Sequence, residues 1–98
     1  MPDTIYLFPT FYEVADTMRH EDDGFVGRAD HIGRQIRIDS TMHPEEKKSV
    51  MLHEIVHSIL TQAGYRDHDE KMADVLANGF LNIIRGNKDL IKWLEEVG

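Results

Sequence analysis

The stretch His53-Glu54-Ile55-Val56-His57 is an H-E-x-x-H pentad within an apolar run, and the predicted fold is organised around it. Residues four apart lie on one face of a helix, so His53 and His57 would present two imidazoles to one point. Two neutral imidazole nitrogens suit Zn²⁺. Glu54 lies about 100° around the helix from His53, where its carboxylate can reach a water molecule at the metal without binding the metal. The alternative is a helix with two surface histidines and a solvated glutamate.

The composition restricts the class of protein. Ninety-eight residues predict a single domain, residues 1–98. A net charge of −7 disfavours binding to nucleic acid through a basic surface. The sequence has no cysteine, which excludes disulfides and thiolate metal sites. Residues 1–8 lack the basic and long apolar segments of a signal peptide, and no apolar run approaches about 18 residues, so we expect a cytoplasmic protein without a membrane span.

The chain begins with one predicted strand and one predicted helix. Thr4–Phe8 is β-branched and aromatic and stops at a proline, which is typical of a strand. Thr10 and Glu13 have the spacing of a capping box, which predicts a short N-terminal helix to about Arg19. The polar residues 20–24 end in glycine and predict a turn.

A β-hairpin is expected next. Phe25–Ala29 and Arg34–Asp39 have the composition of strands, and a turn near Asp30–Gly33 would join them. Gly27 within the first of these strands indicates a bulge or a close backbone approach. Together with the strand at the beginning of the chain, the hairpin would form a small, mostly antiparallel sheet of about three strands.

The helix that carries the pentad is expected to run from Pro44 to Gly64. Proline is favoured at the first helical position, and Glu45 and Glu46 suit the positive end of the helix dipole. Gly64 is a typical residue just past a helix end. On this helix the histidines lie at the border of the apolar stripe, where a packed helix can still face a cleft.

Two more helices are predicted after the pentad. Residues 66–70 open the first of them, and Gly86 should end it. Its apolar stripe consists of Met72, Ala73, Leu76, Phe80, Ile83 and Ile84. Residues 89–97 predict a short amphipathic C-terminal helix, with Trp93 and Leu94 as its expected anchors in the core.

A catalytic zinc site needs a third protein ligand besides the two histidines. Glu70 on the next helix would face His57 if that helix packs antiparallel against the pentad helix. Asp74 would then lie near His53, where a carboxylate can accept the other N–H of a ligating imidazole. Glu70 could instead be a helix N-terminal residue favoured by the dipole, and His68 is the alternative third ligand.

Two segments carry a resemblance to a known family. Met51-Leu-His-Glu-Ile-Val-His57, followed by Glu70-Lys-Met-Ala-Asp-Val-Leu-Ala77, resembles the gluzincin pattern and, more narrowly, the ImmA/IrrE-type metallopeptidases of phages and mobile elements. The resemblance covers roughly the last half of the chain. It implies a minimal zincin-like α+β domain, with a small sheet packed on the H-E-x-x-H helix and a following ligand-bearing helix. Only 12 residues separate His57 from Glu70, which is short for this family, so the connecting loop must be tight.

The resemblance also implies residue roles and an activity. His53, His57 and Glu70 would bind one Zn²⁺, Glu54 would be the catalytic base, and Asp74 would support a ligand. The implied function is that of a zinc metallopeptidase that hydrolyses a peptide bond in a protein or peptide substrate, such as a phage or mobile-element repressor. The alternative is a non-catalytic, antirepressor-like binding module that keeps a structural metal.

Two features of substrate handling are expected near the site. A further donor to the oxyanion is usual in such chemistry, and either Tyr65 or His31 could supply it. The substrate backbone could add to an exposed sheet edge, for which residues 34–39 are the candidate. The sequence does not predict an oligomeric state.

Overall fold

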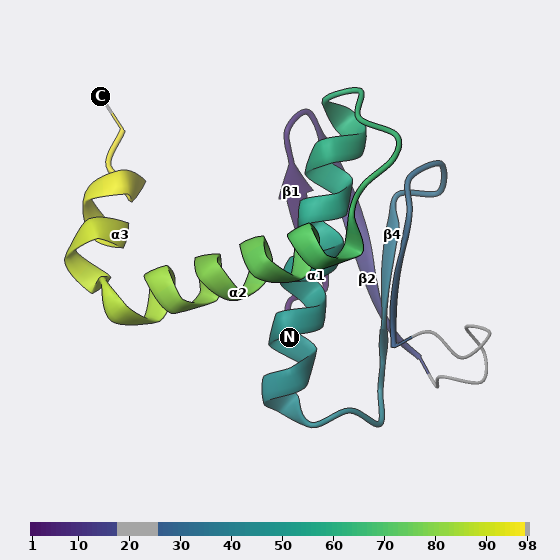
Figure 1. Ribbon diagram of the computed structural model, residues 1–98, viewed down its shortest axis with the longest axis horizontal. Helices are drawn as coiled ribbons and strands as arrows, with labels where there is room; N and C mark the ends of the chain where they lie inside the picture. Colours follow the sequence, from purple (N-terminus) through teal and green to yellow (C-terminus); the bar gives the residue numbers. More distant parts are fainter. Residues whose placement is uncertain (18–25, 98) are drawn as a thin grey trace.

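The computed structural model describes residues 1–17 and 26–97, which fold as a sheet followed by three helices (Figure 1). In chain order the elements are β1 (Thr4–Leu7), β2 (Thr10–Thr17), β3 (Gly27–Asp30), β4 (Gln35–Asp39), α1 (Pro44–Gln62), α2 (Glu70–Gly86) and α3 (Lys88–Glu95). The expected α+β class is confirmed for these residues. The sheet differs from the expected one, because the described residues form four strands in the order β1-β2-β4-β3, and β2 and β4 run parallel.

The helix predicted from Thr10 to Arg19 is wrong, because its described residues form the strand β2. Side chains alternate along this strand: Tyr12 is 2% exposed and Phe11 is 62% exposed. The strand pairs antiparallel with β1 and parallel with β4, so both of its edges are hydrogen-bonded. Pairing with strands on both sides therefore outweighs the local capping pattern of Thr10 and Glu13. The high β-propensity of the other residues in this segment also favours the strand.

The predicted hairpin is confirmed with shifted ends, and the first predicted strand is β1. Strands β3 and β4 pair antiparallel, and residues 31–34 connect them. Ile36 and Ile38 are both 0% exposed, as their alternation in the sequence predicts. The predicted turn at 20–24 and its neighbours 18, 19 and 25 lie outside the described residues.

The exposed sheet edge is not where the sequence placed it. Residues 34–39 were expected at the edge, but β4 lies between β2 and β3. Because β4 joins β2 in parallel, the other arm of its hairpin is pushed outward. Strand β3 therefore ends the sheet, and it lies beside α1.

The core lies between the sheet and α1, which crosses one face of the strands (Figure 1). Its buried residues are Tyr12, Ile36, Ile38 and Met51. Partly buried apolar side chains surround this cluster: Ile5, Leu7, Val14, Ala29, Val50 and Ile55. The pentad helix is thus fixed along one side by packing against the sheet.

Helix α1 begins and ends as the sequence predicts. Pro44 occupies the first turn, and the ring of His43 accepts a hydrogen bond from the backbone N–H of Glu45 at 3.2 Å. After the C-cap Ala63, Gly64 has a φ of +95°, a left-handed conformation that glycine adopts without strain. This residue turns the chain sharply towards α2.

Gly27 confirms the predicted close backbone approach. A Cβ atom at this position would overlap Cγ1 of Val50 and would lie 3.4 Å from Cγ of Glu54. The absence of a side chain lets the edge strand β3 lie directly against the helix that carries the pentad. The distance between the sheet edge and Glu54 therefore depends on glycine at this position.

Gly27→Ala should lower the free energy of unfolding by about 1–3 kcal/mol, because the new methyl group overpacks the contact with Val50. Urea denaturation of Gly27→Ala, Val50→Ala and the double variant would measure the coupling. We expect a smaller penalty in the Val50→Ala background. Gly79→Ala is the control, since a Cβ atom there meets nothing within 4 Å. An equal penalty in both backgrounds would show that the overlap is not the cause.

The two C-terminal helices extend away from the core. Helix α2 crosses α1 and does not run back along it, and α3 stands apart from the sheet (Figure 1). Ala73 and Ala77 are each 1% exposed where α2 meets α1. The expected anchors Trp93 and Leu94 are 66% and 61% exposed, so that prediction is wrong for the single chain. Among the described residues, no helix is long and apolar enough to cross a membrane.

Candidate metal site

The two pentad histidines and Glu70 come together where α2 crosses α1. Nε2 of His53 lies 3.0 Å from Nε2 of His57. The carboxylate of Glu70 spans both rings, with Oε2 at 2.8 Å from Nε2 of His53 and Oε1 at 3.1 Å from Nε2 of His57. Within the described part of the chain, these three residues form a group whose ligand atoms all lie within 4.8 Å of one another. The group could hold a metal ion.

The crossing of the helices brings Glu70 to this point, although the antiparallel packing considered from the sequence is not found (Figure 1). Asp69 caps α2 by accepting a hydrogen bond from Lys71 N–H at 2.9 Å, which fixes the first turn. The small, buried Ala73 and Ala77 allow that turn to lie close to α1. Glu70 consequently reaches both histidines, and not His57 alone.

Asp74 orients His53. Its Oδ1 lies 2.6 Å from Nδ1 of His53, as the sequence led us to expect. An ionised carboxylate can only accept, so Nδ1 must carry the hydrogen. In the neutral imidazole this leaves a lone pair on Nε2, the atom that faces Glu70.

His68 orients His57 in the same way. Nε2 of His68 contacts the backbone carbonyl of Tyr65, and because a carbonyl can only accept, this nitrogen carries the hydrogen. Nδ1 of the neutral His68 is then an acceptor, and it lies 2.7 Å from Nδ1 of His57. His57 must therefore donate from Nδ1 and keep its lone pair on Nε2. His68 therefore contacts the ring nitrogen of His57 that is turned away from Glu70, and the candidate ligand group of His53, His57 and Glu70 does not include it.

In the neutral tautomers that a metal site requires, three electron-rich atoms converge, whereas a protonated ring donates its Nε2–H to Glu70. The Nε2 atoms of His53 and His57 each present a lone pair, and Glu70 adds a carboxylate. Such an arrangement calls for a cation. A tetrahedral Zn²⁺ about 2.0–2.1 Å from each ligand atom would hold these atoms about 3.3 Å apart, within about half an ångström of the observed separations. Two imidazoles and one carboxylate also form a donor set typical of catalytic zinc.

A sequence model of the IrrE N-terminal-like domain, a peptidase family, matches residues 10–81. The chain belongs to this family. The matched region contains the pentad, Glu70 and Asp74, and the resemblance inferred from the sequence is confirmed. Searches of curated proteins and of solved structures return no significant match.

The charges around the site of this IrrE-like domain favour a cation. Burial lowers the pKa of His53, but the carboxylates of Asp74 and Glu70 outweigh burial, so the pKa lies above its usual value. Burial raises the pKa of Glu70, but its hydrogen bonds to His57 and His53 outweigh burial, so this pKa lies below its usual value. Both shifts show that positive charge is stabilised at the point where the three groups meet.

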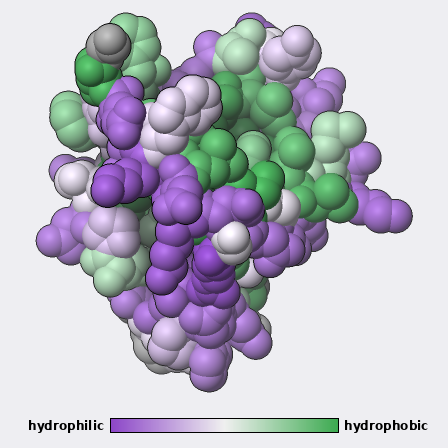
Figure 2. Space-filling model, turned by 90° about the vertical axis from the view of Figure 1, so that its left-hand side faces the viewer, coloured by the Kyte–Doolittle hydropathy of each residue, from purple (hydrophilic) through white to green (hydrophobic). Residues whose placement is uncertain are grey.

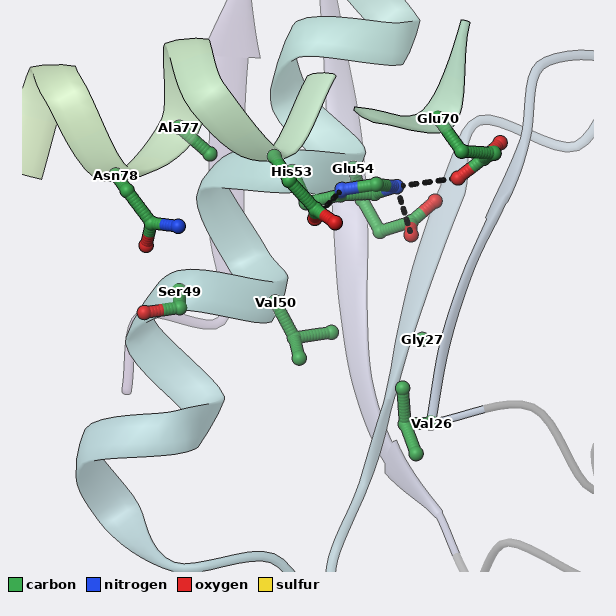
Figure 3. Close-up of a pocket in the computed structure, with 10 residues that line it drawn as sticks. Val26, Gly27, Ser49, Val50, His53, Glu54, Glu70, Ala77 and Asn78 are labelled. Atoms are coloured by element: carbon green, nitrogen blue, oxygen red, sulfur yellow. Dashed lines mark hydrogen bonds and ion pairs between the residues drawn. The ribbon is translucent and has the colours of Figure 1, made fainter. Parts of the chain in front are cut away.

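Glu54 lies beside the cluster without belonging to it. Its side chain is 11% exposed, and Oε2 is 4.0 Å from Nε2 of His53. Figure 3 shows the carboxylates of Glu54 and Glu70 turned towards His53 from different sides. Burial raises the pKa of Glu54, although the two nearby histidines oppose the rise. A buried carboxylate of raised basicity is suited to accept a proton.

Two adjoining hollows give access to Glu54. They have volumes of ≈ 320 Å³ and ≈ 510 Å³, and Glu54, Glu70 and Gly27 line both. One hollow extends towards Asp74, and the other extends towards His68 and the β3–β4 hairpin. The edge strand β3 therefore forms one wall of the site.

The two candidate oxyanion donors differ in position. His31 lines the second hollow together with Glu54 and His57. Its ring lies 3.3 Å from the Tyr12 hydroxyl and 3.4 Å from the hydroxyl of Thr61, and burial lowers its pKa. The Tyr65 side chain is 65% exposed, and this residue offers the site its backbone carbonyl instead.

Thr61 and the orienting role of His68 were not predicted from the sequence. Thr61 follows His57 by four residues, so helical spacing alone could have placed it on the pentad face. No comparable pattern distinguishes His68 as a ligand from His68 as an orienting group, because both roles need a histidine close to the pentad. The distinction requires the position of the Tyr65 carbonyl.

Proposed function

We propose that this chain is a zinc-dependent metallopeptidase that hydrolyses a peptide bond in a protein substrate. The observation that supports it best is the convergence of the ligand atoms of His53, His57 and Glu70 beside the buried carboxylate of Glu54. Membership of a peptidase family agrees with this arrangement. Zn²⁺ is the proposed metal because two imidazoles and a carboxylate suit it.

Each residue of the site has a separate role in the proposed hydrolysis. A bound Zn²⁺ would polarise the scissile carbonyl and lower the pKa of a water molecule at the site. Glu54 accepts a proton from the attacking water as the new C–O bond forms, and it delivers that proton to the leaving amine as the C–N bond breaks. Asp74 and His68 keep the imidazoles in the tautomer that offers Nε2. His31 is the better placed of the two candidate donors to the oxyanion.

The substrate backbone is proposed to lie along β3. This strand ends the sheet and borders both hollows, so an extended peptide added to it would pass Glu54. Gly27 keeps the strand close to α1 and lines both hollows. This assignment replaces residues 34–39, whose strand has neighbours on both sides.

The test of the proposed function is cleavage by the zinc-loaded chain. An unfolded protein such as casein and a panel of regulatory proteins, repressors first, would be incubated with the chain and mapped by mass spectrometry. Cleavage that stops with a zinc chelator and returns with zinc supports the proposal. Zinc binding without cleavage of any tested protein would favour the second candidate, a binding module with a structural metal, for which the exposed apolar surface of α2 and α3 is the supporting observation.

His68→Ala should weaken zinc binding about 10–100-fold, the usual effect of removing a group that orients a ligating histidine. Competition with a fluorescent zinc chelator measures this constant independently of activity. His43→Ala is the control, because His43 caps the start of α1 and is exposed. Unchanged affinity would contradict the orienting role. Complete loss of zinc would make His68 a ligand.

A further inference from the structure

Helices α2 and α3 carry an apolar stripe that the chain itself does not cover. On α2 the spacing of these residues is that of a buried helix face, yet only Ala73 and Ala77 are buried. The exposed members are Met72 (57%), Leu76 (38%), Phe80 (46%), Ile83 (46%) and Ile84 (46%) on α2, and Leu90 (39%), Trp93 (66%) and Leu94 (61%) on α3. We call this set the C-terminal stripe. Contiguous apolar surface of this kind marks an interaction site.

The stripe lies on the side of the molecule where α3 stands. Figure 2 views the molecule from that side and shows apolar side chains gathered in a continuous patch with polar residues around it. A groove of ≈ 930 Å³ opens between the start of the chain, α1 and α2. Its lining is mostly apolar and also includes the charged residues Asp16, Lys47 and Lys48. The chain therefore carries both a projecting apolar helix and an apolar groove.

The exposed area is larger than a folded chain of this size requires. The accessible surface is 7155 Å². A monomeric protein of 11.3 kDa is expected to expose about 5,700 Å². The difference of about 1,400 Å² exceeds the roughly 800 Å² that each partner contributes to an interface of standard size. Taken over all 98 residues, the chain thus has surplus surface of the size that one partner contributes to an interface.

The charges of residues 80–97 permit a second copy as the partner. The whole chain has a net charge of −7, so two copies repel each other over most of their surfaces. Residues 80–97 are different, because three basic residues (Arg85, Lys88, Lys92) balance three acidic ones (Asp89, Glu95, Glu96). The repulsion between copies is therefore least at the C-terminal stripe, and this segment does not select a partner of strong positive or negative charge.

We propose that two copies of the chain associate through the C-terminal stripe as a two-fold symmetric dimer, with α3 of each copy packed against the α1–α2 groove of the other. A two-fold axis lets the same surface serve both partners and closes the assembly at two chains. The proposal concerns a surface that is separate from the hydrolytic chemistry, and it stands whether or not the chain is a peptidase.

The mass of the full chain in solution tests the proposal. Light scattering on the zinc-loaded protein over a range of concentrations should give twice 11.3 kDa. Phe80→Glu, on the α2 part of the stripe, and Trp93→Glu, on α3, should each raise the dissociation constant at least about 30-fold, the effect of losing one dominant contact. Val75→Glu is the matched control, because Val75 is an apolar residue, 63% exposed, that lies about 140° around α2 from Phe80.

Each outcome decides the matter. A dimer that both stripe variants break and the control keeps supports the proposal. A wild-type chain that stays monomeric at all concentrations overturns it and leaves the stripe to a different protein. A dimer that survives both stripe variants also overturns it, because the copies then meet elsewhere. Circular dichroism of each variant, compared with the wild type, shows whether a loss of mass reflects dissociation or unfolding.

Discussion

Glu54→Gln should reduce peptide-bond cleavage by about 10²–10⁴-fold while the chain still binds one zinc ion. The amide keeps the size of the carboxylate but cannot accept the proton of the attacking water. Zinc should remain, because Glu54 is 4.0 Å from Nε2 of His53 and the ligand group consists of other residues. Elemental analysis for zinc and cleavage rates measured on the same preparation separate the two effects.

The matched control is Glu46→Gln, which makes the same chemical change at an exposed position of the same helix. Its cleavage rate should equal that of the wild type. Undiminished proteolysis in Glu54→Gln would refute the role of Glu54 as base. Loss of zinc in Glu54→Gln would instead place Glu54 among the groups that hold the metal.

Glu70→Ala should remove most of the bound zinc and, with it, the stability that zinc provides. Only His53 and His57 would remain as ligands, and the side chain that bridges their Nε2 atoms would be gone. At a free zinc concentration 1,000 times the dissociation constant, binding stabilises the folded wild type by about 4 kcal/mol. Thermal denaturation with and without zinc should therefore show a large zinc-dependent shift for the wild type and little or none for Glu70→Ala.

Asp67→Ala is the control for that experiment, since Asp67 is an exposed acidic residue three positions earlier. It should keep one zinc ion per chain and the full thermal shift. If Glu70→Ala retains stoichiometric zinc and His68→Ala loses it, the ligand assignment is wrong and His68 is the third ligand. Zinc retained by both variants would point to a ligand outside this group.

The pentad helix could be predicted from the sequence because local rules determine it. Pro44 at its start and Gly64 after its end act through the backbone of their own turn, and the histidines share a face by helical spacing alone. The contact of Asp74 with His53 could also be predicted from the sequence, because it requires only that α2 packs against α1. Neither inference depends on the topology of the sheet.

Strand β2 could not be predicted from its own residues. Thr10 and Glu13 satisfy a helix-capping pattern, while Phe11, Tyr12 and Val14 have high β-propensity, so the local signals conflict. The strand forms because β1 and β4 hydrogen-bond to its two edges, and each residue of β2 that pairs with β4 has its partner 22 positions later in the sequence. The edge strand was predicted wrongly for the same reason. Pairing between β2 and β4 decides which strand lies at the edge, and this long-range pairing could not be seen in the sequence.

The crossing of α2 over α1 gives the C-terminal helices a mechanical property. Helix α2 has 17 residues and is therefore about 25 Å long, and it meets α1 near its first turns, at Glu70, Ala73 and Ala77. Because its contacts with α1 are confined to this end, a tilt of about 10° beside the candidate metal ligands would move the far end of α2 by about 4 Å. Trp93, the only tryptophan of the chain, lies beyond that far end. The fluorescence of Trp93 should therefore report a tilt of α2 at its contact with α1.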